Sequence, residues 1–506
     1  MKRLVADAGR SIVMVALLVV SLSCAPESSP ARPSTARVVY QHSMVTLDPH
    51  AHNDGVTGAV LSSVYQALVA IEPGATIRPV LAEKWTTPND TTWQFRLRPG
   101  VRFHDGKEVT VADVVASIRR ARFAPESSLA TYTDGIAEVR KLPGHDLAFE
   151  ITTEAPFPLL LSRLAMVAIV SRNFEPRSPV GTGPYRWVSG NEHETIVLRD
   201  WPGFWGERPE VPEIRVRFLG TDEQIEKAVR RGNVDVLGKA GLDFVARLDL
   251  DSVPGSWQVV RNPAATTTML GLNATSGPLA HQGVRRAIEC VIDQRRLVQD
   301  VYGGQGASPA FSIIPEEVFG AEPREPCGGP DLARAKSLLE KAGIDQGAKI
   351  SLQHARMTAA VVEHVVKRIE LLGFSVSVED LPYDVFYRRL ETADLEAFIF
   401  GWNFLFSDAS DFLDAMAHTR EPERHLGDTN GTAYSNQEVD RLIESAAREP
   451  VPERRLQQLR SAIRILADER PYLPLFHAER QSIFRAPFIM DERPGSWVQP
   501  HEIRYR

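Results

Sequence analysis

Three adjacent segments decide the fold class: "KISLQ" (residues 349–353), "AAVVEHVVKRIELLG" (359–373) and "FSVSVE" (374–379). In the middle segment apolar side chains recur every three or four residues, which predicts a helix that ends at Gly373. The first segment is short and the third alternates apolar with polar residues, so both predict strands. A strand, a helix and a strand joined by short loops predict a right-handed crossover in a largely parallel sheet, and hence an α/β protein.

The pattern continues in the stretch "AFIFGWNFLFSDASDFLD" (397–414). Its first four residues are apolar and predict a buried strand that breaks at Gly401. In open α/β sheets, ligands bind beyond the carboxyl ends of the strands. The loop from Trp402 to Asp411 is therefore expected to lie at a ligand-binding site.

A similar unit lies earlier in the chain. "TWQFRLRPG" (92–100) alternates like a half-buried strand, and "FHDGKEVTVADVVASIRR" (103–120) follows it. His104 and Asp105 could form an acid/base pair, but the Asp-Gly dipeptide at 105–106 is better explained by a turn. A helix is expected to begin after Thr110, which forms a capping-box pattern with Asp113.

The sequence gives little support for an enzyme, because the candidate catalytic motifs are incomplete. "EHE" (192–194) and "HEIRYR" (501–506) lack the paired histidines of a zinc helix, and no G-x-S-x-G is present. "GTGPY" (181–185) lacks the Lys-Ser/Thr that completes a phosphate loop, so its glycines are interpreted as part of a tight turn. We therefore predict a binding protein with no catalytic residue, no metal and no cofactor.

Length and charge narrow the class further. The chain has 506 residues, of which 43% are hydrophobic and 24% charged, so it is long enough for roughly three domains of about 150 residues. Its net charge is -7 and it has no run of five or more Lys or Arg residues. Binding to nucleic acid is therefore not expected.

The N-terminus predicts export. Lys2, Arg3 and Arg10 precede the apolar run "SIVMVALLVVSL" (11–22), which is too short to span a membrane but suits the core of a signal peptide. We assign residues 1–23 to this signal peptide. The chain is expected outside the cytoplasmic membrane, in the periplasm or at the cell surface.

The run ends in "SLSC" (21–24), which resembles a bacterial lipoprotein signal with Cys24 as the lipidated residue. The resemblance is incomplete, because Ser21 stands where such signals usually carry Leu. The Pro/Ser-rich stretch that follows predicts a flexible linker over residues 24–35. The alternatives are a lipid-anchored protein and a soluble secreted protein cleaved nearby.

Two further cysteines, Cys290 and Cys327, remain. In an oxidising compartment they form either a disulfide or two free thiols, and Cys290 alone suits a buried position in a helix. Their spacing does not match a metal site.

Eight segments, in order, resemble the family 5 extracellular solute-binding proteins of bacterial ABC importers, the dipeptide- and oligopeptide-binding group. They are "VYQALVAIEPGATIRPVLAEKW" (64–85), "WQFRLRPGVRFHDGKEVTVADVVASI" (93–118), "GTGPYRW" (181–187), "FWGERPEVPEI" (204–214), "AVRRGNVDV" (228–236), "VRRAIECVID" (284–293), "AYSNQEVDRLI" (433–443) and "RPYLPLFH" (470–477).

This resemblance implies a type II two-lobe clamp, as in periplasmic binding proteins, with an extra inserted domain. The implied parts are lobe I (36–61, 179–268 and 474–506), the inserted domain (62–178) and lobe II (269–473). The two chain crossings between the lobes are expected near residues 270–273 and 473–477.

The resemblance also implies a function. The lobes of a monomer would close around a small peptide or peptide-like solute and deliver it to ABC permease and ATPase subunits. Two alternatives stay open. One is a receptor of the same fold for an oligosaccharide, a modified peptide or a metal chelate, and the other is a ligand sensor for a membrane partner.

Loops after the predicted strands supply the candidate ligand-binding residues. The candidates are His42 and Met44 after the first strand, His354 and Arg356 in the second lobe, and Trp402, Asn403, Leu405 and Asp408 in the loop described above.

The resemblance gives three of these positions a role. In peptide-binding relatives a basic residue before the long second-lobe helix can meet the ligand's carboxylate, and His354 or Arg356 matches it in position. Those relatives place an Asp three residues after the loop Trp, against the ligand's α-ammonium group, where this chain has Leu405. A buried ammonium without its carboxylate is strongly disfavoured. Either the ligand is a peptide that is anchored by Asp408 or bound loosely through its backbone, or it is a different solute such as a modified peptide, an oligosaccharide or a chelated metal.

Overall fold

The structure is a computed structural model that describes residues 32–72, 76–191, 193–262, 266–322, 328–344, 347–355, 357–404, 407–491 and 497–506. The chain divides into two units, Met1–Pro33 and Ser34–Arg506, and every element below belongs to the second. The predicted signal peptide and Cys24 lie outside the described residues. Among the residues that are described, no helix is long and apolar enough to cross a membrane.

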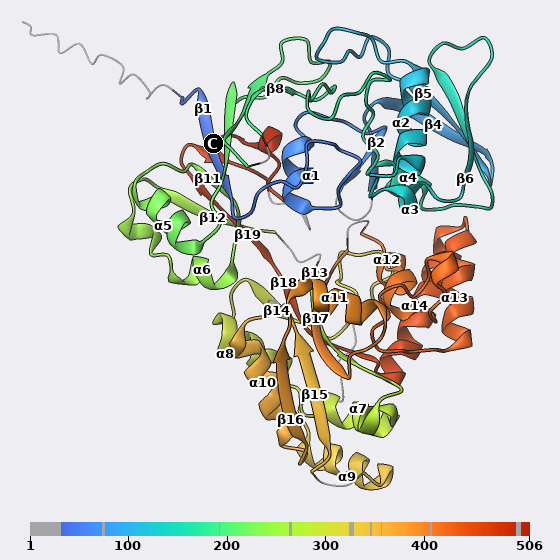
Figure 1. The fold of residues 1–506 in the computed structure, drawn as a ribbon, viewed down its shortest axis with the longest axis vertical. Helices are drawn as coiled ribbons and strands as arrows, with labels where there is room; N and C mark the ends of the chain where they lie inside the picture. Colours follow the sequence, from blue (N-terminus) through green and yellow to red (C-terminus); the bar gives the residue numbers. More distant parts are fainter. Residues whose placement is uncertain are drawn as a thin grey trace, which may run out of the picture. The chain divides into compact units, whose positions relative to one another are not determined.

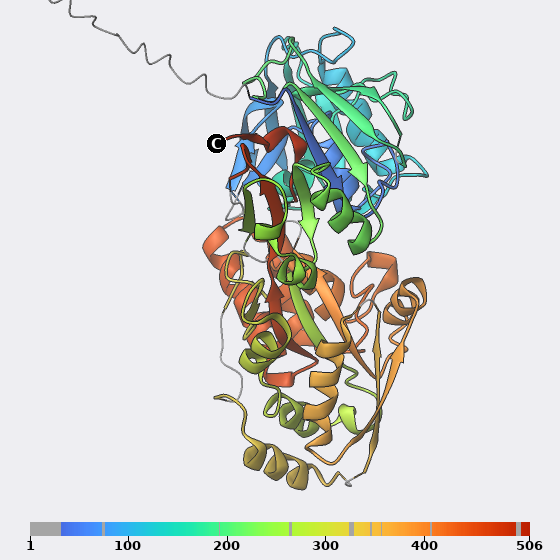
Figure 2. The ribbon, with the colours of Figure 1, turned by 90° about the vertical axis from the view of Figure 1, so that its left-hand side faces the viewer.

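The first sheet has seven strands in the order β12-β19-β11-β1-β10-β9-β8. They are β1 (Thr35–Tyr40), β8 (Tyr185–Ser189), β9 (Ile196–Asp200), β10 (Glu213–Phe218), β11 (Val236–Ala240), β12 (Trp257–Asn262) and β19 (Arg480–Arg485). The central strand β1 pairs in parallel with both β10 and β11, whereas the other pairings in this sheet are antiparallel. Figure 2 shows β1, in dark blue, among green strands. The sheet therefore combines segments from both ends of the chain.

The second sheet has six strands in the order β14-β18-β13-β17-β15-β16. They are β13 (Thr266–Leu272), β14 (Ala307–Pro309), β15 (Lys349–His354), β16 (Ser375–Asp380), β17 (Ala397–Asn403) and β18 (Tyr472–Ala478). Parallel pairing is confined to β16-β15-β17, and the remaining pairs are antiparallel. The expectation of a largely parallel sheet is therefore wrong. The β-α-β unit extends an antiparallel half whose strands lie far apart in the sequence.

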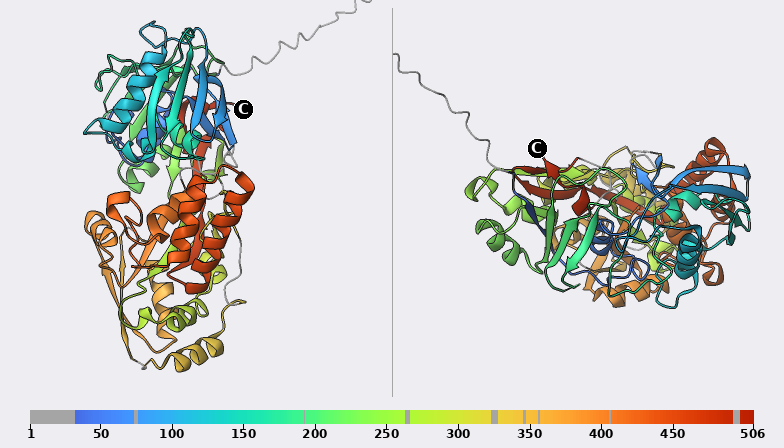
Figure 3. Two further views of the ribbon diagram at one scale, coloured as in Figure 1. Left: turned by 90° about the vertical axis from the view of Figure 1, so that its right-hand side faces the viewer. Right: turned by 90° about the horizontal axis from the view of Figure 1, so that it is seen from above.

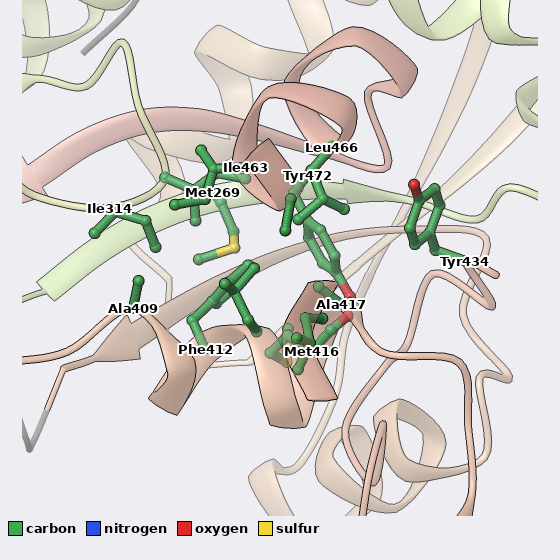
Figure 4. Close-up of a cluster of buried hydrophobic side chains, with 14 of the residues drawn as sticks. Met269, Ile314, Ala409, Phe412, Met416, Ala417, Tyr434, Ile463, Leu466 and Tyr472 are labelled. Carbon is green, nitrogen blue, oxygen red and sulfur yellow. Dashed lines mark hydrogen bonds between the residues drawn. The ribbon is translucent and has the colours of Figure 1, made fainter. Parts of the chain in front are cut away.

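Alternation along the strands of the second sheet creates a core on each face. Met269 and Phe398 belong to one core, and their neighbours Leu270 and Ile399 belong to the other. In the first core the side chains of Met269, Phe412 and Tyr472 point toward one another (Figure 4), with the rings of Phe412 and Tyr472 packed edge-on at 5.4 Å. The sheet is thus the middle layer of three.

Helices cover both faces of this sheet. One face carries α7 (Gln282–Glu289), α8 (Gln294–Tyr302), α9 (Leu332–Ala342) and α10 (Ala359–Glu370), and the other carries α11 (Tyr383–Glu391), α12 (Ser410–Phe412), α13 (Gln437–Arg448) and α14 (Pro452–Glu469). Figure 1 shows α10 beside β15 and β16, and the left panel of Figure 3 shows α13 and α14 side by side. The predicted helix at 359–373 is observed, but it ends at Glu370, before Gly373.

A smaller sheet, in the order β4-β5-β7-β6, lies in the segment predicted as the inserted domain. Its strands are β4 (Ala82–Asn89), β5 (Thr92–Leu97), β6 (Ile136–Lys141) and β7 (Ala148–Thr153), and it shares a core with α2 (Val111–Phe123). Thr110 caps α2 and its backbone N–H donates to Asp113 at 2.9 Å, which confirms the predicted capping box. The predicted turn at 105–106 is also observed, with Gly106 at φ 86°.

The remaining elements are short or stand outside the two large sheets. They are α1 (Gly55–Leu61), the hairpin β2 (Val69–Glu72) and β3 (Thr76–Pro79), α3 (Ala130–Thr133), α4 (Leu160–Leu164), α5 (Asp222–Arg230), α6 (Leu242–Arg247), and the pair β20 (Phe488–Ile489) and β21 (Arg504–Tyr505). Helix α5 packs on the first sheet through Ile225 and Val229.

The chain passes from the first sheet to the second between β12 and β13, and returns between β18 and β19. The positions expected for these crossings, near 270–273 and 473–477, lie instead at the end of β13 and within β18, and both strands are hydrogen-bonded into the second sheet. The predicted lobe and insert boundaries themselves stay a prediction.

Candidate ligand-binding site

A cavity of about 380 Å³ lies beside α1 and collects residues from distant parts of the chain. Asn53 and Asp54 come from the loop before α1, and Tyr132 comes from α3. Phe404, which directly follows β17, lines the cavity together with Arg480 at the start of β19. The two large sheets therefore both contribute to its wall, and a cavity of this size suits a small ligand.

Three carboxylates line the wall, those of Asp54, Glu72 and Glu502, and Asp54 is held by its neighbours. It caps α1 by accepting hydrogen bonds from the backbone N–H and the hydroxyl of Thr57, at 2.7 and 2.6 Å. His42 Nε2 lies 3.1 Å from its other oxygen. Burial acts to raise the pKa of Asp54, but the hydrogen bonds from His42 and Thr57 outweigh it and lower the pKa to about 2. Asp54 is thus ionised at any physiological pH.

Trp497 forms an aromatic surface on the same wall. A Cβ atom on Gly55 would lie 2.5 Å from the Trp497 ring, so only glycine at this position lets the indole pack against the start of α1. The His42 ring meets the indole edge-on, with 6.3 Å between the ring centroids. His42, which the sequence singled out, therefore contacts two residues that line the cavity.

Two cations lie over the Trp497 ring. Lys239 Nζ, on β11, is 4.6 Å from the ring centroid, and Arg480 Cζ is 5.2 Å from it, both within the range of cation–π contacts. Burial lowers the pKa of Arg480 to about 10. Partial removal from water and then the charge of Arg480 lower the pKa of Lys239, and Asp54 opposes this more weakly. Loss of hydration is thus the main cause of the lowered pKa of Lys239.

Asn403 connects this wall to the second sheet. Its side-chain oxygen accepts hydrogen bonds from the Thr266 hydroxyl at 2.5 Å and from Arg480 Nη2 at 3.3 Å. Asn403 is the last residue of β17, which continues beyond Gly401 because Gly401, Trp402 and Asn403 all pair with β13. The predicted break of the strand at Gly401 is therefore wrong, whereas Asn403 does lie next to the cavity's arginine.

Two other candidates lie in hydrophobic cores and not in the cavity wall. Met44 is 1% exposed and packs in the core of the first sheet. Trp402 is half-buried against the core of the second sheet, with its ring edge-on to Phe412 at 5.9 Å. Of the described residues in this loop, Phe404 and Ser407 line the cavity.

Asp408 is engaged by the protein itself. Its two carboxylate oxygens accept hydrogen bonds from Arg455 at 2.6 and 2.8 Å, and both side chains are almost fully buried. The backbone N–H and hydroxyl of Ser410 donate to the same carboxylate. Asp408 borders a second cavity, of about 310 Å³, together with Arg455. Its contacts are those of a structural ion pair.

The other candidates are placed as follows. His354 ends β15, is 6% exposed, and has its Nδ1 3.4 Å from Asp380 Oδ1. It is not among the residues that line the cavity. Arg356 and Leu405 lie outside the described residues. Cys290 is fully buried and disulfide-bonded. Because Cys327 also lies outside the described residues, the pairing of these two cysteines stays a prediction.

Sequence reasoning missed Trp497, Lys239 and Arg480. No local signal marks them, because each meets the others only when β11, β19 and the C-terminal segment are assembled around α1. One hint was available, since Arg480 follows soon after residues 473–477, which were predicted to cross between the lobes.

The comparisons with known proteins agree on one class. Residues 76–423, more than half of the chain, match the family described as bacterial extracellular solute-binding proteins, family 5 middle. The chain is 25% identical over 477 residues to the glutathione-binding protein GsiB of Salmonella paratyphi A, covering 90% of each chain.

Solved structures share the fold. The periplasmic binding protein DppA from Helicobacter pylori, in complex with the peptide STSA, is 21% identical with a TM-score of 0.76, covering 93% of this chain and 98% of that one. NikZ from Campylobacter jejuni, in complex with Ni(L-His), is 16% identical with a TM-score of 0.76, covering 93% and 99%.

The mixed α/β fold with a cavity between two sheets defines a two-lobe periplasmic binding protein, as the sequence predicted. More specifically, the chain belongs to the family 5 bacterial extracellular solute-binding proteins. It is therefore a binding protein and not an enzyme.

Proposed function

We propose that this protein captures a small peptide or peptide-like solute in the cavity beside α1 and delivers it to an ABC importer. The observation that supports this most is the composition of the cavity wall. Arg480 belongs to the first sheet, Phe404 follows a strand of the second sheet, and both residues line the same cavity. A ligand that contacts both sides would favour a closed arrangement of the lobes. The names of GsiB and of the DppA complex point to peptide-like ligands in relatives.

The proposal includes a place in the cell. Residues 1–23 would be removed as a signal peptide, Cys24 would carry a lipid, and residues 24–35 would tether a monomer to the membrane. Permease and ATPase subunits would be its partners. Loss of membrane association after the substitution Cys24→Ser, with secretion retained, is the expected result. Unchanged association would contradict the lipid anchor.

A different solute is the second candidate. Leu405 stands where peptide-binding relatives place an Asp, and a protein of the same fold binds Ni(L-His). A receptor for a chelate, a modified peptide or an oligosaccharide, or a sensor that reports such a ligand to a membrane partner, would use the same cavity.

Ligand screening separates these candidates. Thermal unfolding of the mature protein is measured with glutathione, with di- to tetrapeptides, with oligosaccharides and with nickel–histidine. Peptides or glutathione are expected to raise the melting temperature, because a ligand bound only by the folded state stabilises it. A rise caused only by oligosaccharides or nickel–histidine would contradict the peptide assignment and support the second candidate.

A further inference from the structure

We propose that His418, Glu421 and Glu444 form a binding site for a divalent transition-metal ion, with Zn²⁺ as the best match, beside α13. The inference is independent of the solute in the cavity, because none of the three residues lines either cavity described above. One imidazole nitrogen and one oxygen from each carboxylate all lie within 4.8 Å of one another. The sequence predicts no metal here, since His418 and Glu421 meet Glu444 only when their loop folds onto α13.

The backbone of His418 is held from both sides. Residues Leu413–Ala417 form a turn of π-helix, and the His418 N–H donates to the Leu413 carbonyl at 2.9 Å. The side-chain amide of Asn430 donates to the His418 carbonyl, also at 2.9 Å. The imidazole itself is fully buried. Such a side chain is well placed to be a ligand, because it loses little conformational freedom when it binds an ion.

The hydrogen bonding of the His418 ring leaves one nitrogen for an ion. Nδ1 lies 2.6 Å from the Thr419 carbonyl oxygen. A carbonyl oxygen only accepts, so Nδ1 carries a proton, and in the neutral ring Nε2 then presents a lone pair. Histidines that bind metals nearly always have this arrangement, in which the second nitrogen donates to a carbonyl, a carboxylate or water and fixes the tautomer.

Nε2 of His418 faces a carboxylate oxygen at the distance expected for a shared ion. It lies 3.3 Å from Glu444 Oε1. A lone pair and an ionised carboxylate repel each other at this distance unless a cation lies between them. Two ligand atoms that are each about 2.1 Å from a tetrahedral Zn²⁺ ion lie about 3.4 Å apart. The observed separation therefore fits an ion shared by the two side chains, and the competing explanation is a second proton on the ring.

Arg424 partly neutralises the two carboxylates. Its Nη1 donates to Glu421 Oε2 at 2.8 Å and to Glu444 Oε1 at 2.9 Å. The hydrogen bond from Arg424 is the largest cause of the lowered pKa of Glu444, which is therefore ionised at neutral pH. The Arg424 side chain is 44% exposed, so it can move into water when an ion arrives. Zn²⁺ carries two positive charges and would balance both carboxylates, whereas the guanidinium carries one.

The ligand set favours zinc over calcium or magnesium. Those two ions prefer six or more oxygen ligands, whereas an imidazole nitrogen combined with carboxylates matches Zn²⁺. Asp440 lies nearby, but its oxygens accept hydrogen bonds from the backbone N–H and hydroxyl of Thr419 at 2.8 and 2.6 Å. Three protein ligands leave a fourth position for water. An ion bound there links the loop after residue 417 to α13 and stabilises the folded protein.

Zinc binding to the metal-free mature protein tests the inference. Calorimetry at neutral pH is expected to show one saturable site, and Co²⁺ in that site should give the visible absorption of a four-coordinate ion. Glu421→Gln and Glu444→Gln keep the shape of each side chain and should each weaken Zn²⁺ binding at least about tenfold. Arg424→Gln removes the competing guanidinium and should tighten it by about two- to fivefold.

Two controls keep the outcomes apart. Glu438→Gln removes a carboxylate that pairs with Arg441 on the exposed face of the same helix, and it should leave the Zn²⁺ affinity unchanged. His425→Asn removes an exposed imidazole from the same loop and should also have no effect.

Three results would overturn the site. The first is the absence of saturable Zn²⁺ binding, in which case a proton on Nε2 fills the gap between His418 and Glu444. The second is native affinity in both Glu421→Gln and Glu444→Gln, which would place the ion elsewhere. The third is binding to Arg424→Gln that is no tighter than to the native protein, which would show that the guanidinium does not compete for the same oxygens.

Discussion

Asp408 and Arg455 form a buried bidentate ion pair, with 2.6 Å between Oδ2 and Nη1 and 2.8 Å between Oδ1 and Nη2. The pair joins the loop after β17 to the first turn of α14. Ser410 completes the hydrogen bonding of the carboxylate. A carboxylate with these contacts stabilises the packing of α14 on this loop, so its hydrogen-bonding capacity is used within the protein.

Asp408→Asn should therefore reduce stability without weakening ligand binding. Removing one partner of a buried ion pair leaves an unpaired charge, which costs about 3 to 5 kcal/mol. Urea unfolding measures the free energy, and calorimetry at low temperature measures the affinity of the folded protein. Asp251→Asn, at an exposed position, is the matched control. A variant that keeps native stability but loses affinity for free amines would restore Asp408 to the binding site.

The raised pKa of Asp414 predicts that the stability of the protein depends on pH. Burial raises its pKa to about 6, while Arg163, with its Nη2 4.0 Å away, opposes the shift, as do Arg455 and His418. Asp408 adds to the shift. Because the folded pKa lies above that of the unfolded chain, the carboxyl group stabilises the fold below about pH 4, and this contribution is lost as the pH rises through about 6.

The substitution Asp414→Asn should remove this loss of stability at higher pH. The variant is expected to be more stable than the native protein by about 1 to 3 kcal/mol at neutral pH, and nearly equal to it near pH 4. Urea unfolding at the two pH values measures the difference. Greater destabilisation of the variant at neutral pH than near pH 4 would show that the contact with Arg163 outweighs the burial of the charge.

The parts of the fold that follow local rules were predictable. The Thr110–Asp113 capping box and the strands and helices around residues 349–380 depend on neighbouring residues only. The cavity depends on contacts between residues hundreds of positions apart, such as Gly55 with Trp497. The position of Asp408 in its loop suggested a ligand contact. The sequence alone could not correct this prediction, because nothing in it indicates that Arg455 on α14 pairs with the same carboxylate.

The disulfide of Cys290 offers a third prediction. With Cys327 as its partner it would close a loop of about 37 residues, and it would contribute on the order of 3 to 4 kcal/mol by restricting the unfolded chain. A mature protein in which Cys24 is replaced by Ala should show no reactive thiol when unfolded without reductant. Reduction should lower its melting temperature. Two reactive thiols would rule out the bond.

The glycines of "GTGPY" supply the last prediction. The sequence suggested a tight turn, but these glycines allow two backbone segments to approach each other, with Gly183 N–H donating to the Val64 carbonyl at 2.8 Å. A Cβ atom on Gly181 would lie 1.9 Å from that carbonyl oxygen, and one on Gly183 would lie 2.5 Å from the Ser63 oxygen. Backbone atoms cannot move aside as the end of a flexible side chain can.

Gly181→Ala and Gly183→Ala should therefore each destabilise the protein by about 1 to 3 kcal/mol or more, because the two segments must separate. Gly220→Ala is the control, since nothing lies within 4 Å of its added Cβ atom. That variant should stay within about 1 kcal/mol of the native protein. Thermal unfolding with far-UV circular dichroism compares all three. Equal melting temperatures would show that the junction between residues 63–64 and 181–185 has room for a side chain, and that the glycines serve another purpose.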